Sequence, residues 1–204
     1  LRGEDIPEFV SNLVENIKNH TNVDVITGSE IKNVSGYVGN FTTTLESGKE
    51  IKHGVTIIAT GGKEYKPSEY LYGQNDRVLT QLELEEAIAA GDQRVAGAKT
   101  AVLIQCVGSR EPGRMYCSRV CCAKSVKLAL KLKDKNPDMK VYILYRDIRT
   151  YSFFEDLYRE ARSKGVIFVR FALENKPVVE AADNGLKVTV TDHVLGLPLE
   201  IEAD

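Results

Sequence analysis

The second half of the chain alternates buried strands with amphipathic helices, and this alternation restricts the fold more than any other feature. Short, fully apolar runs are typical of strands buried on both faces, and apolar residues at helical spacing indicate the helices between them. In chain order the segments are 100–105, 118–134, 141–145, 153–164 and 166–170. Such an order is half of a doubly wound parallel sheet. We therefore expect an α/β fold with a Rossmann-like three-layer unit over residues 98–204.

The first seventy residues follow another pattern. A helix is predicted over residues 6–19, followed by short β-rich runs separated by glycines, which indicate an antiparallel meander. The apolar run 55–60 before Gly61 and Gly62 is expected to be a buried strand that enters a tight loop.

These patterns divide the chain into three parts. We expect a small module over residues 1–70 and a connecting segment over 71–97 with one helical patch at 80–90. The third part is the Rossmann-like domain over 98–204. It is expected to close with a hairpin at the Asp183-Asn184-Gly185 turn.

Composition excludes several classes of protein. The net charge is −2 with 27% charged residues, so nothing favours binding to nucleic acid or to an anionic membrane. The sequence contains no apolar run of the ~20 residues that a membrane span needs, and no signal-peptide pattern. We expect a cytoplasmic protein, in which thiols stay reduced. Because the chain begins with Leu1 rather than Met, we expect either a processed protein or a piece of a longer one, and favour the second.

All four cysteines lie close together, in the spacing C-x10-C-x3-C-C. Cys106 ends the first predicted strand of the α/β unit, and Cys117, Cys121 and Cys122 lie at the start of the following helix. The carboxyl ends of the strands are where this architecture binds ligands, and a helix N-terminus stabilises thiolate, the form that binds metal. Four thiolates are the usual ligands of an iron–sulfur cluster.

Other interpretations of the cysteines remain open. They are structural zinc, a disulfide or thiol relay, and simple packing, although adjacent Cys121 and Cys122 do not suit the usual spacing of a zinc site. Nearby cations either offset the charge of a cluster or form a solvated helix face: Arg110, Arg114, Arg119, Lys124 and Lys127.

The glycine loop that binds NAD(P) is missing from the sequence. No G-x-G-x-x-G motif occurs, and the turn after the first strand carries cysteines instead. The segment 145–149, Tyr-Arg-Asp-Ile-Arg, superficially resembles residues that recognise a ribose or a 2′-phosphate. We expect the loop to have exchanged phosphate binding for cluster binding.

Two motifs support a family resemblance. CVGSR at 106–110, followed by YCSRVCC at 116–122, resembles the A subunit of CoB–CoM heterodisulfide reductase and its relatives, which are iron–sulfur flavoproteins. Further matches are GYVGNF at 36–41, IIATGG at 57–62 and LYRDIRTY at 144–151.

The resemblance implies an oxidoreductase function. It implies a thioredoxin-reductase-like core that binds FAD, with residues 1–70 a partial FAD-domain module and Gly61 and Gly62 in a loop that contacts FAD. The four cysteines would hold the cluster, favoured as 4Fe–4S although a 2Fe–2S centre also fits. Lys127 is the candidate for a residue between cluster and flavin. The partners would be other subunits of such reductases or electron carriers.

We therefore predict an electron-transfer segment that moves electrons between FAD and the cluster and is inactive in isolation. Two alternatives belong to other classes. One is a scaffold domain with structural zinc. The other is part of an NAD(P)H-dependent disulfide reductase with Cys117 and Cys121 as the redox pair.

Overall fold

The computed structural model describes residues 5–204, and the chain divides after Gly62 into two units. The first unit contains a helix, α1 (Ile6–Lys18), and a three-stranded antiparallel sheet in the order β1-β2-β3. The strands are β1 (Ile31–Tyr37), β2 (Asn40–Leu45) and β3 (Glu50–His53). The helix begins where it does because the Asp5 carboxylate accepts a hydrogen bond from the Glu8 N–H at 3.1 Å. The antiparallel meander predicted from the sequence is confirmed.

Two details of the first unit differ from the prediction. From its glycines, the sequence around Gly36 and Gly39 predicts a stretch rich in turns, but Gly36 lies within strand β1, Ile31–Tyr37. Gly36 lies inside this strand with φ +101°, and a Cβ there would lie 2.1 Å from the Asn40 carbonyl oxygen, so the glycine permits close approach in the hairpin.

The predicted buried strand at 55–60 is wrong. This stretch lies outside the strands, and Ile57 and Ile58 are 86% and 84% exposed. Apolar composition alone does not make a strand, because each strand needs a neighbour that accepts its backbone hydrogen bonds.

The second unit, Lys63–Asp204, is built on two sheets. The parallel sheet has the order β4-β5-β6, and the antiparallel sheet has the order β7-β8-β9. The strands of the parallel sheet are β4 (Thr100–Ile104), β5 (Lys140–Tyr145) and β6 (Ile167–Arg170). Those of the antiparallel sheet are β7 (Val178–Ala182), β8 (Gly185–Thr191) and β9 (Pro198–Ala203), so the expected terminal hairpin is extended by a third strand.

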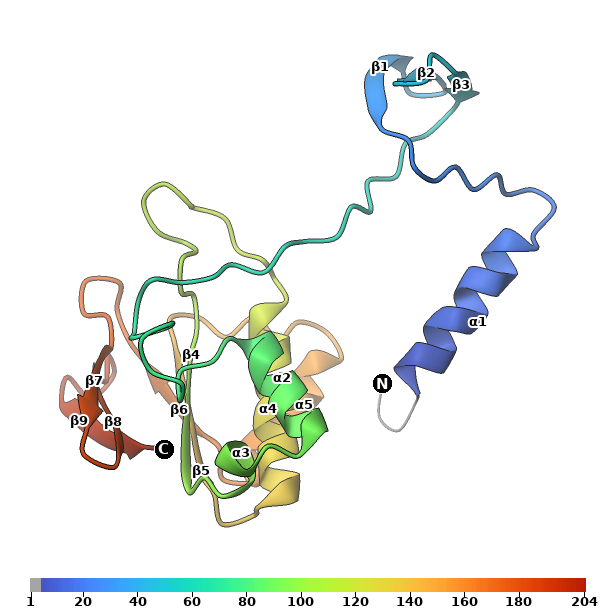
Figure 1. The fold of residues 1–204 in the computed structure, drawn as a ribbon. Helices are drawn as coiled ribbons and strands as arrows, with labels where there is room; N and C mark the ends of the chain where they lie inside the picture. Colours follow the sequence, from blue (N-terminus) through green and yellow to red (C-terminus); the bar gives the residue numbers. More distant parts are fainter. Residues whose placement is uncertain (1–4) are drawn as a thin grey trace. The chain divides into compact units, whose positions relative to one another are not determined.

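Helices cover one face of the parallel sheet and the β7–β9 sheet covers the other, as Figure 1 shows. The helices are α2 (Gln81–Ala90), α3 (Gln93–Ala96), α4 (Cys121–Lys135) and α5 (Phe154–Ser163). Strand β5 illustrates the layering: Val141 and Ile143 pack with the helices, whereas Leu144 packs against the other sheet. Each such side chain contributes ~1.5–3 kcal/mol by leaving water. The predicted α/β fold with a Rossmann-like three-layer unit is confirmed.

The segment 71–97, expected to be a connection, packs as part of the second unit. Ile88 of α2 is 7% exposed, and Leu84 and Val95 pack against the core formed with α4. The unit therefore begins at Lys63 rather than after residue 97. In the part of the chain that the structure describes, no helix is both long and apolar enough to cross a membrane.

Candidate functional site

The four cysteines lie along one connection, between β4 and α4. Cys106 lies just after the end of strand β4, and Cys121 and Cys122 are the first two residues of α4. Cys117 lies on the loop between them. Cys106 and Cys122 are buried, whereas Cys117 and Cys121 are partly exposed. The site thus occupies the carboxyl edge of the parallel sheet, as the sequence predicts and where this fold class places its ligands.

The neighbouring thiols of Cys121 and Cys122 differ in acidity. Interaction with the Cys122 thiol, together with the Ser118 hydroxyl and backbone N–H groups at the start of α4, lowers the pKa of Cys121, although burial opposes this. The Cys122 thiol donates to the Asp147 carbonyl at 3.7 Å, and interaction with Cys121 and burial raise the pKa of Cys122. One thiolate beside one thiol is the expected state of this pair near neutral pH.

The other two cysteines have their own nitrogen donors. The Arg110 guanidinium lies 3.9 Å from the Cys106 sulfur, and the backbone N–H of Arg119 donates to the Cys117 sulfur at 3.3 Å. Electrostatic interaction with Cys106 also contributes to the raised pKa of Cys122.

The loop has a backbone that few L-residues adopt. Cys106, Arg110 and Arg119 have φ of +63°, +59° and +62°. A non-glycine residue in this region costs on the order of 1–3 kcal/mol, and such strain concentrates at binding and active sites.

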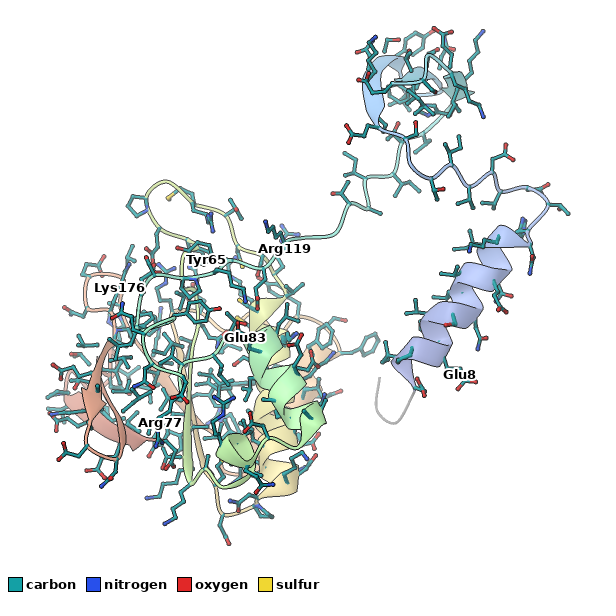
Figure 2. All side chains as sticks on the ribbon, in the orientation of Figure 1. Glu8, Tyr65, Arg77, Glu83, Arg119 and Lys176 are labelled. Carbon is teal, nitrogen blue, oxygen red and sulfur yellow. The ribbon has the colours of Figure 1, made fainter. Side chains whose placement is uncertain are left out.

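Packing from outside the loop holds this conformation. The amide of buried Gln105 donates to the Ser125 hydroxyl at 2.9 Å, and this bond fixes the end of β4 to helix α4. Glu111 pairs with Lys176 at 2.7 Å, from the segment that follows β6 (Figure 2).

Tyr65 packs on the same loop from the segment that opens the second unit (Figure 2). Its ring fills the space beside Gly108, where a Cβ would lie 2.1 Å from the Tyr65 Cε1 atom. The Arg114 guanidinium lies 4.4 Å from the centre of the same ring. Sequence reasoning missed Tyr65. The one signal available was the glycine two residues after Cys106, since a glycine often marks close approach of another chain segment.

The cations near the cysteines do not act as one group. Of the five named from the sequence, Arg110 is the one whose side chain bonds a cysteine sulfur in an interaction that the structure records. Lys124 forms an ion pair with Glu85 at 2.8 Å, and exposed Lys127 lies 4.8 Å from the centre of the Phe154 ring.

In the segment 145–149, Arg146 is not free to recognise a nucleotide. Arg146 is buried, and its guanidinium donates to the backbone carbonyls of Ser109 and Arg110 at 2.7 and 2.9 Å. The charge that looked suited to a 2′-phosphate therefore supports the cysteine loop instead.

Gly61 and Gly62 lie where the first unit ends. Gly61 has φ +70°, and apart from each glycine and its two chain neighbours, no heavy atom of the described residues lies within 4 Å of a Cβ placed on either glycine. This open backbone allows a ligand to approach closely.

The donor set suits a thiolate-bound metal group in its chemistry, because two cysteines begin helix α4 and the pKa of one of them, Cys121, is lowered there. The cysteines are not arranged as a complete metal site. Within residues 5–204, no three side chains of His, Cys, Asp or Glu lie close enough together to hold a metal ion. Ligation by all four cysteines therefore requires a change of conformation around Cys117.

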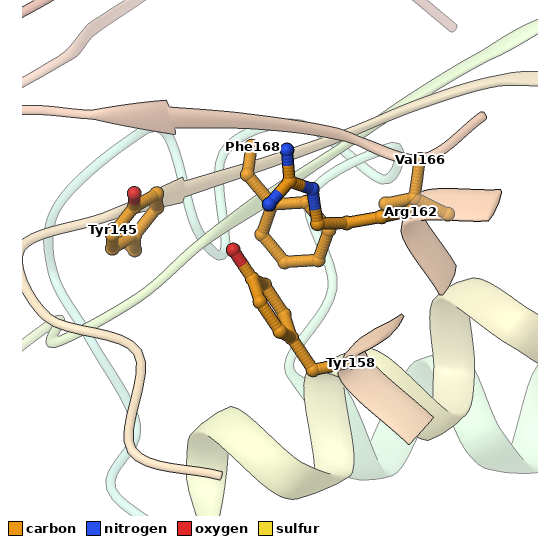
Figure 3. Close-up of a pocket in the computed structure, with 5 residues that line it drawn as sticks. All are labelled: Tyr145, Tyr158, Arg162, Val166 and Phe168. Atoms are coloured by element: carbon orange, nitrogen blue, oxygen red, sulfur yellow. The ribbon is translucent and has the colours of Figure 1, made fainter. Parts of the chain in front are cut away.

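A separate cavity of about 360 Å³ lies between α5 and the sheet, shown in Figure 3. The ring of Phe168 meets those of Tyr145 and Tyr158 edge-on, at centroid distances of 6.3 and 4.8 Å. Arg162 and Val166 complete the lining, so the cavity is distinct from the cysteine loop.

Comparison with known proteins places these features in context. No family model matches the chain. It is 39% identical over 173 residues to the A subunit of the H2:CoB–CoM heterodisulfide,ferredoxin reductase of Methanothermobacter marburgensis, and the match covers 76% of this chain and 26% of the relative. It is 30% identical over 296 residues to the iron–sulfur A subunit of the CoB–CoM heterodisulfide reductase of Methanocaldococcus jannaschii, covering 97% and 44%.

A solved structure shares the fold. The L-lysine 6-monooxygenase from Pseudomonas syringae matches with a TM-score of 0.51 and 10% identity, covering 97% of this chain and 55% of that one. At this identity the likeness shows the fold alone. The chain spans less than half the length of the curated relatives named above. Over the span that it shares with them, the chain belongs to the family formed by the A subunits of CoB–CoM heterodisulfide reductases.

Proposed function

We propose that this chain is an electron-transfer segment of an iron–sulfur flavoprotein of the kind formed by the A subunits of heterodisulfide reductases. It serves an oxidoreductase with several subunits and moves electrons between FAD and an iron–sulfur cluster. The observation that carries the proposal is the placement of all four cysteines on the β4–α4 connection, with Cys106 just after β4 and Cys121 and Cys122 at the start of α4. The name of the relative from Methanocaldococcus jannaschii, which calls it an iron–sulfur protein, agrees with it.

Each cysteine has a stated part in the proposal. An iron–sulfur cluster supplies one-electron transfer when it is bound to thiolates. The proposed ligands are Cys106, Cys117, Cys121 and Cys122. Buried Cys106 and Cys122 would exclude water from one side of the group. Cys117 would join after the loop rearranges.

The flavin contacts are proposed at Gly61, Gly62 and Lys127. The open backbone at the two glycines supports close approach of a cofactor. Lys127 lies on α4, the helix that begins with Cys121 and Cys122, which supports a place near both cofactors. Other reductase subunits or electron carriers would be the partners, and the 204-residue chain by itself would have no turnover.

The test is anaerobic reconstitution of the full chain with iron and sulfide. We expect about four irons per chain and an EPR signal on reduction. Cys122→Ser should lose or alter this signal, and Ser163→Ala, a hydroxyl change at the end of α5, should leave it unchanged. A chain that binds zinc but no iron would contradict the proposal and support a structural metal, and a chain that binds neither would leave the cysteines to packing or thiol chemistry.

A further inference from the structure

Arg146 is a buried cation that bonds the cysteine loop. It is 8% exposed and directly follows β5. Its two terminal nitrogens donate to the consecutive carbonyls of Ser109 and Arg110 at 2.7 and 2.9 Å. A buried guanidinium is strongly disfavoured without such partners, so loop and side chain hold each other in place.

Asp147 extends the connection to both ends of the cysteine motif. Its carboxylate pairs with the guanidinium of Arg110, four residues after Cys106. Its backbone carbonyl lies 3.7 Å from the Cys122 sulfur, at the start of α4. One residue at the end of β5 therefore reaches both buried cysteines, one through Arg110 and the other directly.

The positively charged side chain of Arg110 lies beside Cys106. Its left-handed backbone, φ +59°, turns its carbonyl to Arg146, while its side chain lies between the Asp147 carboxylate and the Cys106 sulfur. Asp147 and the carbonyl bond thus hold one permanent positive charge beside a buried thiol.

A cavity of about 410 Å³ beside these residues invites another explanation, an anion site. Its lining includes Arg110, Arg146 and Arg170. All three already bond protein acceptors: Arg170 donates to the Arg146 carbonyl at 3.1 Å and lies 3.7 Å from the Asp147 carboxylate. Because these groups are engaged, the arrangement favours support of the loop over capture of a ligand.

We propose that Arg146 and Asp147 form a clamp that positions Cys106 and Cys122 and holds the Arg110 charge at Cys106. The clamp deepens the proposed function and rests on it for its role in electron transfer. The two residues are positioning residues, since they act through the loop and through Arg110. The charge of Arg110 stabilises the reduced, more negative form of a thiolate-bound cluster.

The first test needs no metal. The full chain, reduced and stripped of metal by a chelator, is alkylated with iodoacetamide, and each cysteine is followed by mass spectrometry. In Arg146→Met we expect Cys106 and Cys122 to react about tenfold faster, because the loop opens more often. Arg146→Lys should restore part of the protection. Arg159→Met, which removes the same group from exposed α5, should match the wild type.

A second variant guards against misfolding. The Asp147 side chain is 45% exposed, so Asp147→Asn should keep the fold while it weakens the bond to Arg110. We expect Cys106 to become more reactive in this variant too. If both Arg146→Met and Asp147→Asn fold and leave every alkylation rate unchanged, the clamp is overturned.

The third measurement is the midpoint potential of the reconstituted cluster. Arg110→Gln should disfavour reduction about tenfold, a fall of about 59 mV for one electron, and Arg110→Lys should largely restore it. Arg159→Gln is the matched control. An unchanged potential in Arg110→Gln would refute the role of the charge. A wild-type chain that takes up no iron would refute the proposed function, whereas the alkylation rates would still decide the clamp.

Discussion

At the scale of single residues, the contact between Gly108 and Tyr65 explains how the loop reaches its conformation. Gly108 has φ +60°, and the Tyr65 ring occupies the place that a side chain would take. Both the backbone and the space therefore demand glycine at this position. The loop is held by this ring on one side and by Arg146 on another.

Replacement of Gly108 separates these two demands. Gly113→Ala, in the same loop at φ +85° with open space around it, should lower the free energy of unfolding by about 1 kcal/mol through backbone strain alone. Gly108→Ala should cost about 2–4 kcal/mol, because the new methyl group also displaces the tyrosine ring. Urea unfolding of the full chain measures both.

A double variant identifies the cause. Once Tyr65→Ala has removed the ring, Gly108→Ala no longer creates a clash, so it should cost less in that background than in the wild type. Equal losses for Gly108→Ala and Gly113→Ala would show that the ring does not matter.

At the scale of elements, helix α2 begins with a group of charges that attaches it to the preceding segment. The Thr80 hydroxyl accepts from the Glu83 N–H, and the Glu83 carboxylate accepts from the Thr80 N–H, which forms a capping box. The same carboxylate accepts from Lys66 at 2.8 Å and from the Tyr72 hydroxyl at 2.7 Å. Burial raises the pKa of Glu83, but these hydrogen bonds outweigh it and lower the pKa to about 2.

Because the pKa of Glu83 is lowered on folding, we expect the stability of the protein to fall in acid. A group whose pKa is lowered on folding stabilises the protein above its unfolded value and loses that effect as the pH falls. The free energy of unfolding should therefore decline between pH 4.5 and 2, and the decline should be shallower in Glu83→Gln. Urea unfolding at several pH values measures it. Glu86→Gln, an exposed change on the same helix, should keep the wild-type slope. The same slope in all three proteins would rule out this role for Glu83.

At the scale of the whole molecule, the chain contains two units that differ in how many apolar side chains they bury. The second has two cores on opposite faces of its parallel sheet. In the first, α1 has no buried residue among those described, and apolar side chains of 55–58 are exposed. Packing therefore stabilises the second unit far more than the first.

Limited proteolysis should reveal this difference. Thermolysin cuts before apolar residues, and we expect its first cut near exposed Ile57 or Ile58, because these residues lie outside helices and strands. The product that contains Lys63–Asp204 should resist further cutting and keep a cooperative thermal transition. Replacing both isoleucines with aspartate should slow the first cut. Early cuts inside β4–β6 would contradict the division into units.

Several elements were predictable because their pattern is local. Strands β4, β5 and β6 are apolar on both faces and read as continuous runs, and α4 shows helical spacing. Strand β1 was missed, since its glycine resembles a turn until the hairpin partner is known. The stretch 55–60 looked like a buried strand, because composition does not reveal whether another strand lies beside it.

The residue pattern was enough to establish the α/β order of the second unit, and with it the positions of Cys106 just after β4 and of Cys121 and Cys122 at the start of α4. Periodicity and the topology of parallel strands lead to this result without further information. Three-dimensional packing was needed to show that Arg146 faces inward to the loop and that Tyr65 fills the space at Gly108. These contacts join residues far apart in the chain, and their orientation follows from how side chains pack, which no local pattern encodes.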